Sequence, residues 1–142
     1  MNHKIQQLFD LNHKICLDCY YIVSEFMGDA EGFYYSAMDA MRRPDTVMFV
    51  ATNNYGIQGF VMGRAVCIEN SRIGKLEHLY VTRRAQRSGL GGRLLTEYTN
   101  WAIAQQLSRL QLLSRVTRQA FAFYEKHGFV RVGLGNAMQK TL

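Results

Sequence analysis

The spacing of apolar residues changes twice along the chain, from a helical period to a strand-like period and back. Apolar side chains recur at helical spacing from Leu11 to Met27, and the following Gly28 is typical of a helix end. A second helical stretch, Gly32 to Met41, must stop before Pro44, because the residue preceding a proline is driven out of helical geometry. The first third of the chain therefore predicts two helices, with room for a short strand before them.

The segment after Pro44 has the apolar runs and turn residues of strands. These predicted strands cover residues 47–51, 57–68 and 75–81, with polar turns between them. A long amphipathic helix follows Gly89 and extends to about Gln106. The remaining elements are a strand at 110–114, a helix at 118–127 that ends at Gly128, and strands at 129–132 and 137–141. This order predicts a mixed α/β (α+β) fold in one domain, residues 1–142.

Charge is distributed unevenly over the 142 residues, which carry a net charge of +6. Residues 1–45 hold four basic and seven acidic side chains, net −3, and the remainder carries +9. This balance favours an anionic partner, which could be nucleic acid, a membrane surface or a phosphate-bearing small molecule. No apolar run approaches the ~20 residues of a membrane span, and the start MNHKIQQ does not resemble a signal peptide. We expect a soluble, cytoplasmic protein with no membrane partner.

Cys16 and Cys19 have the CxxC spacing of redox and zinc sites. No second CxxC or paired histidine cluster accompanies them, and no strand leads into them as in thioredoxin-like proteins. We therefore predict two reduced, core-facing thiols and no metal site.

A glycine-rich turn connects the strand ending at Val81 to the long helix. Glycines at 89, 91 and 92 would let phosphate oxygens approach backbone amides that lack intrahelical acceptors. Four arginines add positive charge, with no acidic residue between positions 82 and 93: Arg83, Arg84, Arg87 and Arg93. Taken alone, the turn also fits a plain strand-to-helix connection with solvated arginines. It lacks the Lys-Ser/Thr of a P-loop, and Leu94 stands where G-x-G-x-x-G needs a glycine.

Two segments together resemble the GNAT superfamily of N-acetyltransferases. Residues 86–91 (QRSGLG) are similar to its Q/R-x-x-G-x-G/A acetyl-CoA signature, and residues 120–129 (AFAFYEKHGF) resemble its A-x-x-F-Y-E-x-x-G-F segment. The predicted element order is also typical of the family, so the resemblance covers about residues 47–142. It implies a central, mostly antiparallel mixed sheet flanked by about four helices.

The resemblance implies acetyl-CoA as the cofactor and CoA as the product. Backbone amides of the signature loop would hold the pyrophosphate, which assigns Gln86, Arg87, Ser88, Gly89, Leu90 and Gly91, with Gly92 beside them. The preceding strand would pair its backbone with the pantetheine arm like a short extra strand, through Leu79, Tyr80 and Val81.

Tyr124 matches the family tyrosine that contacts the cofactor and gives a proton to the departing CoA thiolate. A phenol suits this role because it stays protonated at neutral pH. Helical spacing alone would also place Tyr124 in the core with Phe121, Phe123 and Phe129. Thr117 stands where the family often has asparagine, and we expect it to make a weak cofactor contact.

A general base must accept a proton from the attacking amine, directly or through water. Glu77 is the first candidate, because it precedes Leu79 and Val81 by two and four residues and is expected on their face of the strand. Glu77 could equally be a solvated carboxylate or pair with Lys75. His78, expected on the opposite face, is the second candidate, and His127 is predicted to be a cationic helix C-cap.

The family builds its acceptor site largely from the first two helices. Here these carry the acidic residues and five aromatic ones, Tyr20, Tyr21, Phe33, Tyr34 and Tyr35. The acids would attract a cationic amine such as a polyamine, an aminoglycoside or a lysine side chain, or they are merely solvated helix faces. The predicted function is acetyl transfer from acetyl-CoA to a primary amine of a small molecule or peptide. The sequence leaves the oligomeric state open, with a homodimer as one option.

Two other classes of protein compete with this prediction. One is a non-catalytic CoA-binding module that senses the cofactor or regulates a partner. The other is a nucleic-acid binder, which is disfavoured because the arginines crowd one turn and form no stripe with stacking aromatics. We therefore expect no nucleic-acid partner.

Overall fold

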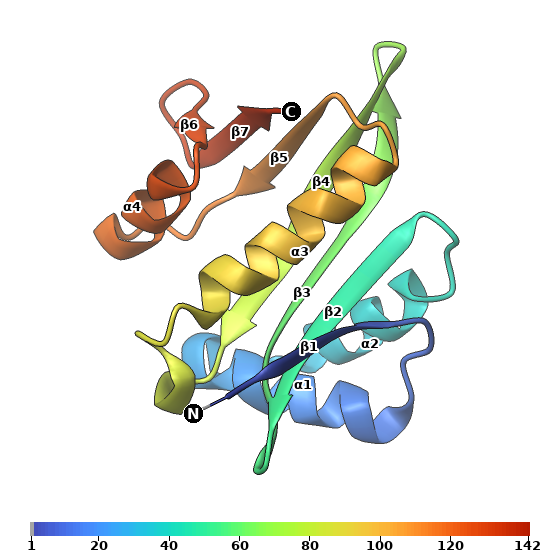
Figure 1. Cartoon of the computed structure of the whole chain (residues 1–142), viewed down its shortest axis with the longest axis vertical. Helices are drawn as coiled ribbons and strands as arrows, with labels where there is room; N and C mark the ends of the chain where they lie inside the picture. The colour runs from blue at the N-terminus through green and yellow to red at the C-terminus, as the bar shows by residue number, and fades with distance from the viewer. Residues whose placement is uncertain (1) are drawn as a thin grey trace.

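The computed structural model describes residues 2–142, whose strands form one sheet in the order β1-β2-β3-β4-β5-β7-β6 (Figure 1). The strands are β1 (Lys4–Leu8), β2 (Thr46–Asn53), β3 (Gly56–Ile68), β4 (Ser71–Val81), β5 (Arg109–Leu113), β6 (Val130–Arg131) and β7 (Ala137–Thr141). The helices are α1 (His13–Met27), α2 (Glu31–Ala40), α3 (Leu90–Ala104), α4 (Arg118–Lys126) and a short 3-10 turn, η1 (Arg83–Ala85). The predicted mixed fold with four flanking α-helices is confirmed.

All neighbouring strands are antiparallel except β4 and β5, which run parallel. This parallel pair holds over two positions, Gly74 opposite Leu110 and Lys75 opposite Gln111. Beyond Lys75 the two strands diverge, so the second half of β4 pairs with β3 alone. The sheet is therefore open between β4 and β5.

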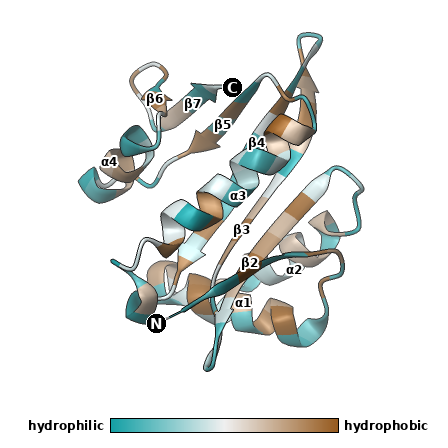
Figure 2. Cartoon of the chain, in the orientation of Figure 1, coloured by the Kyte–Doolittle hydropathy of each residue, from teal (hydrophilic) through white to brown (hydrophobic). Residues whose placement is uncertain are grey.

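Helices cover both faces of the sheet around β2 and β3. Val47, Phe49 and Ala51 belong to the core under α3, whereas Met48 and Val50 belong to the core under α1 and α2. Because both faces are buried, β2 is a continuous apolar run and not an alternating one. Figure 2 shows the apolar stretches of β2 and the mixed character of the helices that cover it. Cys16 and Cys19 are buried under α1, as predicted.

Tyr98 of α3 explains two glycines in the sheet. A Cβ atom on Gly63 would lie 2.5 Å from Cε1 of Tyr98, and one on Gly74 would lie 2.9 Å from its hydroxyl. The glycines leave space for this fully buried ring between α3 and the sheet. Any side chain at either position would push α3 away from β3 and β4.

The strand β4 begins four residues earlier than predicted. Glu69 and Asn70 both have positive φ angles, 51° and 65°, and Ile68 pairs directly with Ser71. Such a two-residue turn matches the twist of an antiparallel hairpin, so the polar residues Ser71 and Arg72 continue the strand. None of the helices within residues 2–142 is long and apolar enough to cross a membrane.

Candidate active site

The glycine-rich loop places two left-handed residues directly before α3. Arg87 has φ of 64° and Gly89, the N-cap of α3, has φ of 79°. No side chain caps α3, and its first turn contains no acidic residue. Ser88 lies between Arg87 and Gly89, and its hydroxyl donates to the carbonyl of Ala85 at 2.5 Å. Backbone amides in such a loop point outward together and form a site that favours an anion.

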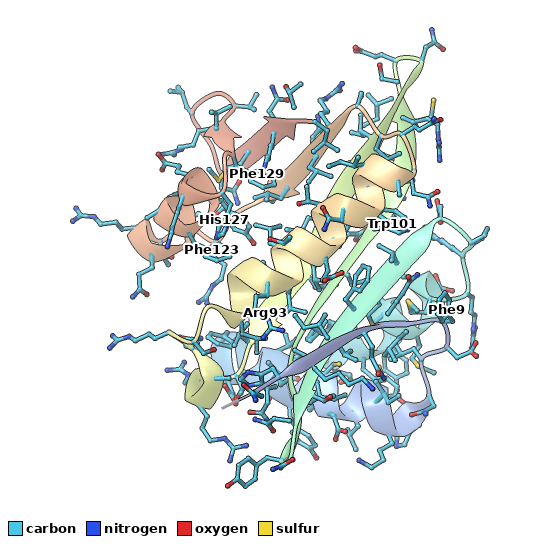
Figure 3. The ribbon with its side chains drawn as sticks, viewed as in Figure 1. Phe9, Arg93, Trp101, Phe123, His127 and Phe129 are labelled. Atoms are coloured by element: carbon cyan, nitrogen blue, oxygen red, sulfur yellow. The ribbon has the colours of Figure 1, made fainter. Side chains whose placement is uncertain are left out.

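Three of the four arginines near this loop are held by other parts of the fold. Arg83 donates to the Glu25 carbonyl at 2.8 Å, Arg84 lies over the ring of Tyr55, and Arg93 donates to the His3 carbonyl at 3.2 Å. Figure 3 shows Arg93 on α3 near β1. Within residues 2–142, Arg87 is the arginine of this group whose guanidinium has no such partner.

Gly91 and Gly92 face α4 rather than open space. A Cβ on Gly91 would meet the ring of Phe123 at 3.4 Å, and a Cβ on Gly92 would lie 3.0 Å from Cε1 of His127. Figure 3 shows Phe123 and His127 side by side on α4. The missing side chains therefore let α4 pack on α3, which differs from the sequence-based interpretation that they give phosphate access. Gly89, by contrast, has open space around it and is required for its positive φ.

Tyr124 of α4 and Tyr80 of β4 lie close enough for their charges to interact. Burial, with a smaller contribution from the nearby Tyr80, raises the pKa of Tyr124 to about 12. Tyr124 packs edge-to-face on Phe123 and on Phe129. The predicted proton donor is thus near one predicted cofactor strand residue, and its phenol remains protonated at neutral pH.

A cluster around Phe26 joins α1 to the site and was missed by the sequence analysis. The guanidinium groups of Arg83 and Arg115 lie 5.2 and 5.5 Å from the centroid of Phe26, and the Tyr80 ring lies 5.8 Å away. The pKa of Tyr80 is raised, because the effect of burial is larger than the opposing effect of the Arg115 charge. Residues from α1, β4 and the loop after β5 meet here, and no motif marks such a long-range cluster in the sequence.

Glu77 lies on the face of the sheet opposite to the one predicted. Met62 pairs with His78 and Gly63 pairs with Leu76, so Glu77 is an extra residue in β4, a β-bulge. Its carboxylate accepts a hydrogen bond from Nε of Arg64 at 2.5 Å. Arg64 follows Gly63, which faces α3, and therefore points to the other side. The prediction that Glu77 shares a face with Leu79 and Val81 is wrong. The extra residue of the bulge interrupts the regular alternation of side chains between the two faces of β4.

His78 points into an aromatic cluster beneath α2. Its ring lies 4.9 Å from that of Phe33, and it is tilted over Tyr80 at 6.3 Å. Burial lowers its pKa, and the nearby Glu77 opposes this shift. The imidazole is therefore mainly neutral at neutral pH.

A cleft of about 430 Å³ opens where β4 and β5 begin to diverge. Glu77 lines this cleft, whereas His78 does not. The other lining residues are Arg64, Lys75, Leu76, Gln111, Leu112, Leu113, Val132, Ala137, Met138 and Gln139. Within residues 2–142, no cluster of three or more His, Cys, Asp or Glu side chains is arranged to hold a metal ion.

Two further predicted residues have structural roles at the ends of α4. Thr117 is its N-cap, and its hydroxyl oxygen accepts from the Ala120 amide at 3.1 Å. His127 is its C-cap, as expected, but burial and the charges of Lys126 and Lys140 lower its pKa. The expected cation at this end is instead Lys140, which donates to the His127 carbonyl at 2.9 Å.

The comparison with protein families is consistent with this geometry. Residues 44–131 match the acetyltransferase (GNAT) domain. The chain therefore belongs to the GNAT acetyltransferase family. No curated protein matches the sequence significantly.

Solved structures share the fold over nearly the whole chain. The PaiA N-acetyltransferase from Thermoplasma acidophilum in complex with coenzyme A is 18% identical, with all of both chains covered and a TM-score of 0.75. A chain of the NatC complex bound to Gag peptide and CoA is 16% identical, with 100% of this chain and 99% of that chain covered and a TM-score of 0.84. An aminoglycoside acetyltransferase from an uncultured soil metagenomic sample is 16% identical, with 94% and 96% covered and a TM-score of 0.75.

Proposed function

We propose that the protein is an acetyl-CoA-dependent N-acetyltransferase that transfers the acetyl group directly to a primary amine. The observation that carries this proposal is the opening between β4 and β5 beyond Lys75. The loop before α3 follows the end of β4, Tyr124 lies near Tyr80 of the same strand, and Glu77 lines the cleft where the opening begins.

The residues around the opening fit a CoA thioester. The loop from Gln86 to Gly91, with the guanidinium of Arg87, offers amides and charge to a pyrophosphate. The segment Leu79–Val81 pairs with β3 on one side, and β5 has diverged on the other. Its free edge suits the amides of a pantetheine arm, which pair with it as a short extra strand. Thr117 stays a candidate contact through its hydroxyl proton.

Two protons must move during the proposed transfer. Acetyl-CoA supplies the acetyl thioester, whose C–S bond breaks as the acceptor nitrogen forms a C–N bond to the carbonyl carbon. Glu77 accepts the proton that the nitrogen loses, directly or through a water molecule. Tyr124 donates its hydroxyl proton to the departing sulfur and regains one from solvent. The high pKa of Tyr124, about 12, keeps this proton in place until sulfur becomes basic.

The decisive test is the response of the protein to CoA and amines. Millimolar CoA should raise the melting temperature, because a ligand that binds only the native state stabilises it. Acetyl-CoA plus a panel of amines should then release free thiol. If CoA produces no shift at millimolar concentration, the proposal fails at its first step.

One observation favours the alternative, a CoA-binding regulatory module. The Glu77 carboxylate already accepts a hydrogen bond from Arg64, which makes it less available to accept a proton from an amine. This alternative predicts a strong CoA-induced rise in melting temperature without thiol release for any amine. Thiol release with one amine would exclude it.

A further inference from the structure

One face of the sheet carries a polar row across four strands. Arg64 pairs with Lys75, Lys75 with Gln111, and Gln111 with Gln139, so β3, β4, β5 and β7 each contribute one residue. Residues paired across strands have side chains on the same face, about 5 Å apart. All four residues line the cleft beside Glu77.

The two basic side chains of this row differ in whether an acidic partner neutralises their charge. Arg64 is paired with Glu77 at 2.5 Å, so these two charges offset each other. Within the described chain, the Lys75 ammonium has no hydrogen-bond or ion-pair partner. It lies between a guanidinium and the Gln111 amide, both of which can donate hydrogen bonds. The row therefore presents an uncompensated positive charge flanked by donors, which favours a carboxylate.

Among residues 2–142, the rest of the cleft lining is apolar and includes no further acid. The exposed residues Leu113 and Val132 line it, together with parts of Leu112 and Ala137. None of the seven acidic residues in positions 1–45 lines it. Several are used elsewhere, since Glu25 binds Thr82 and Asp18 pairs with Lys14. A polyamine or aminoglycoside would place several cations against Lys75 and Arg64.

We propose that the acceptor is an amine that also carries a carboxylate and an apolar group, as in an apolar amino acid. The carboxylate binds Lys75 and the neighbouring glutamine amides, and the apolar group contacts Leu113 and Val132. The amine then lies at the Glu77 end of the row, where its proton is accepted. This inference rests on the proposed acetyl transfer, and it replaces the cationic acceptor suggested by the acidic first third of the chain.

The test uses pairs of acceptors that differ only in the carboxylate. Thiol release from acetyl-CoA is measured with phenylalanine and phenethylamine, with leucine and isopentylamine, and with spermidine. We expect kcat/KM to be at least about tenfold higher for each amino acid than for its decarboxylated partner, compared at equal concentrations of the neutral amine. Tenfold corresponds to the free energy of one charge-assisted contact, which the decarboxylated amine cannot make. Lys75→Met should remove most of this preference, because it should lower kcat/KM for the amino acids and leave kcat/KM for the decarboxylated amines unchanged.

Lys14→Met is the matched control, because Lys14 is an exposed lysine on α1 whose partner is Asp18. It should leave the preference unchanged. The inference is overturned if phenethylamine, isopentylamine or spermidine reacts as well as the amino acids, or if Lys75→Met lowers both members of a pair equally. It is also overturned if CoA raises the melting temperature but no amino acid releases thiol. If CoA causes no shift and no amine reacts, the proposed function fails as well.

Discussion

The imidazole of His127 occupies the space that a side chain on Gly92 would fill, with Cε1 3.0 Å from the position of its Cβ. This contact joins the end of α4 to the first turn of α3. Tyr124 lies one helical turn before His127, so its position depends on how closely the two helices approach. The glycine-rich turn thus positions the candidate acid as well as offering amides to an anion.

Gly92→Ala should therefore impair catalysis more than stability. Alanine gains up to about 1 kcal/mol over glycine in a helix, but the new Cβ must displace His127 and with it α4. We expect kcat to fall several-fold, with a melting temperature at or below that of the wild type. Gly91→Ala is the matched control, because its Cβ would make an ordinary 3.4 Å contact with Phe123. It should raise the melting temperature of the unliganded protein, and an equal rise in both variants with unchanged kcat would contradict this explanation.

Tyr124→Phe should lower kcat by about 10²-fold, the usual loss when a positioned general acid is removed. The ring keeps its contacts with Phe123 and Phe129, so the affinity for CoA should change little. Steady-state kinetics and CoA titration separate the two quantities. An unchanged kcat would remove the acid role. Because the pKa of Tyr124 is about 12, the wild type should lose no activity from its ionisation below pH 10.

Glu77→Gln should remove the acidic limb of the kcat/KM profile, because glutamine cannot accept the amine proton. It should also lower the maximum rate by at least about tenfold. His78→Gln is the comparison, since His78 packs on Phe33 and does not line the cleft. The His78→Gln variant should keep the acidic limb of the kcat/KM profile. The opposite pattern in the two variants would transfer the role of base to His78.

Glu25→Gln should weaken cofactor binding without changing kcat at saturation. The carboxylate of Glu25 accepts from Oγ of Thr82 at 2.6 Å and from the amide of Arg83 at 2.9 Å, which fixes the start of the loop proposed to bind the pyrophosphate. An amide nitrogen at one of these positions would face a donor, at a cost of about 1 kcal/mol. Asp18→Asn, which affects only an exposed pair, should cost less than about 0.5 kcal/mol. Equal CoA dissociation constants for wild type and Glu25→Gln would refute this role.

Burial of His78 should make stability depend on pH near neutrality. Its pKa is lowered in the folded protein, so the unfolded chain binds this proton first as pH falls. The stability linked to the neutral ring is complete above about pH 6.5 and decreases as pH falls through the folded pKa. Urea unfolding at pH 7.5 and pH 5.5 should show a smaller pH difference for His78→Leu than for the wild type. The same difference in both proteins would show that other groups, such as His127, carry the pH dependence.

Local patterns in the sequence predicted most of the fold. The helical spacing before Gly28, the strand-like runs after Pro44, the helix start after Gly89 and the helix end at Gly128 are local features, and the helices and strands follow them within a few residues. The loop signature and the segment around Tyr124 also identified the family, because each depends on contiguous residues. The charge of the chain alone could not separate a cofactor loop from a nucleic-acid surface.

Tertiary structure decided what each side chain faces. The bulge at Glu77 follows from how β3 and β4 pair, and a period-two pattern cannot reveal an extra residue in one strand. Gly91 and Gly92 face α4, and Arg93 reaches His3 just before β1, because of contacts between distant segments. The row formed by Lys75, Gln111 and Gln139 likewise exists only through strand register. The sequence by itself determined the elements and the family, and long-range packing determined which charged side chains line the cleft, because strand register and bulges bring together residues that are distant in the chain.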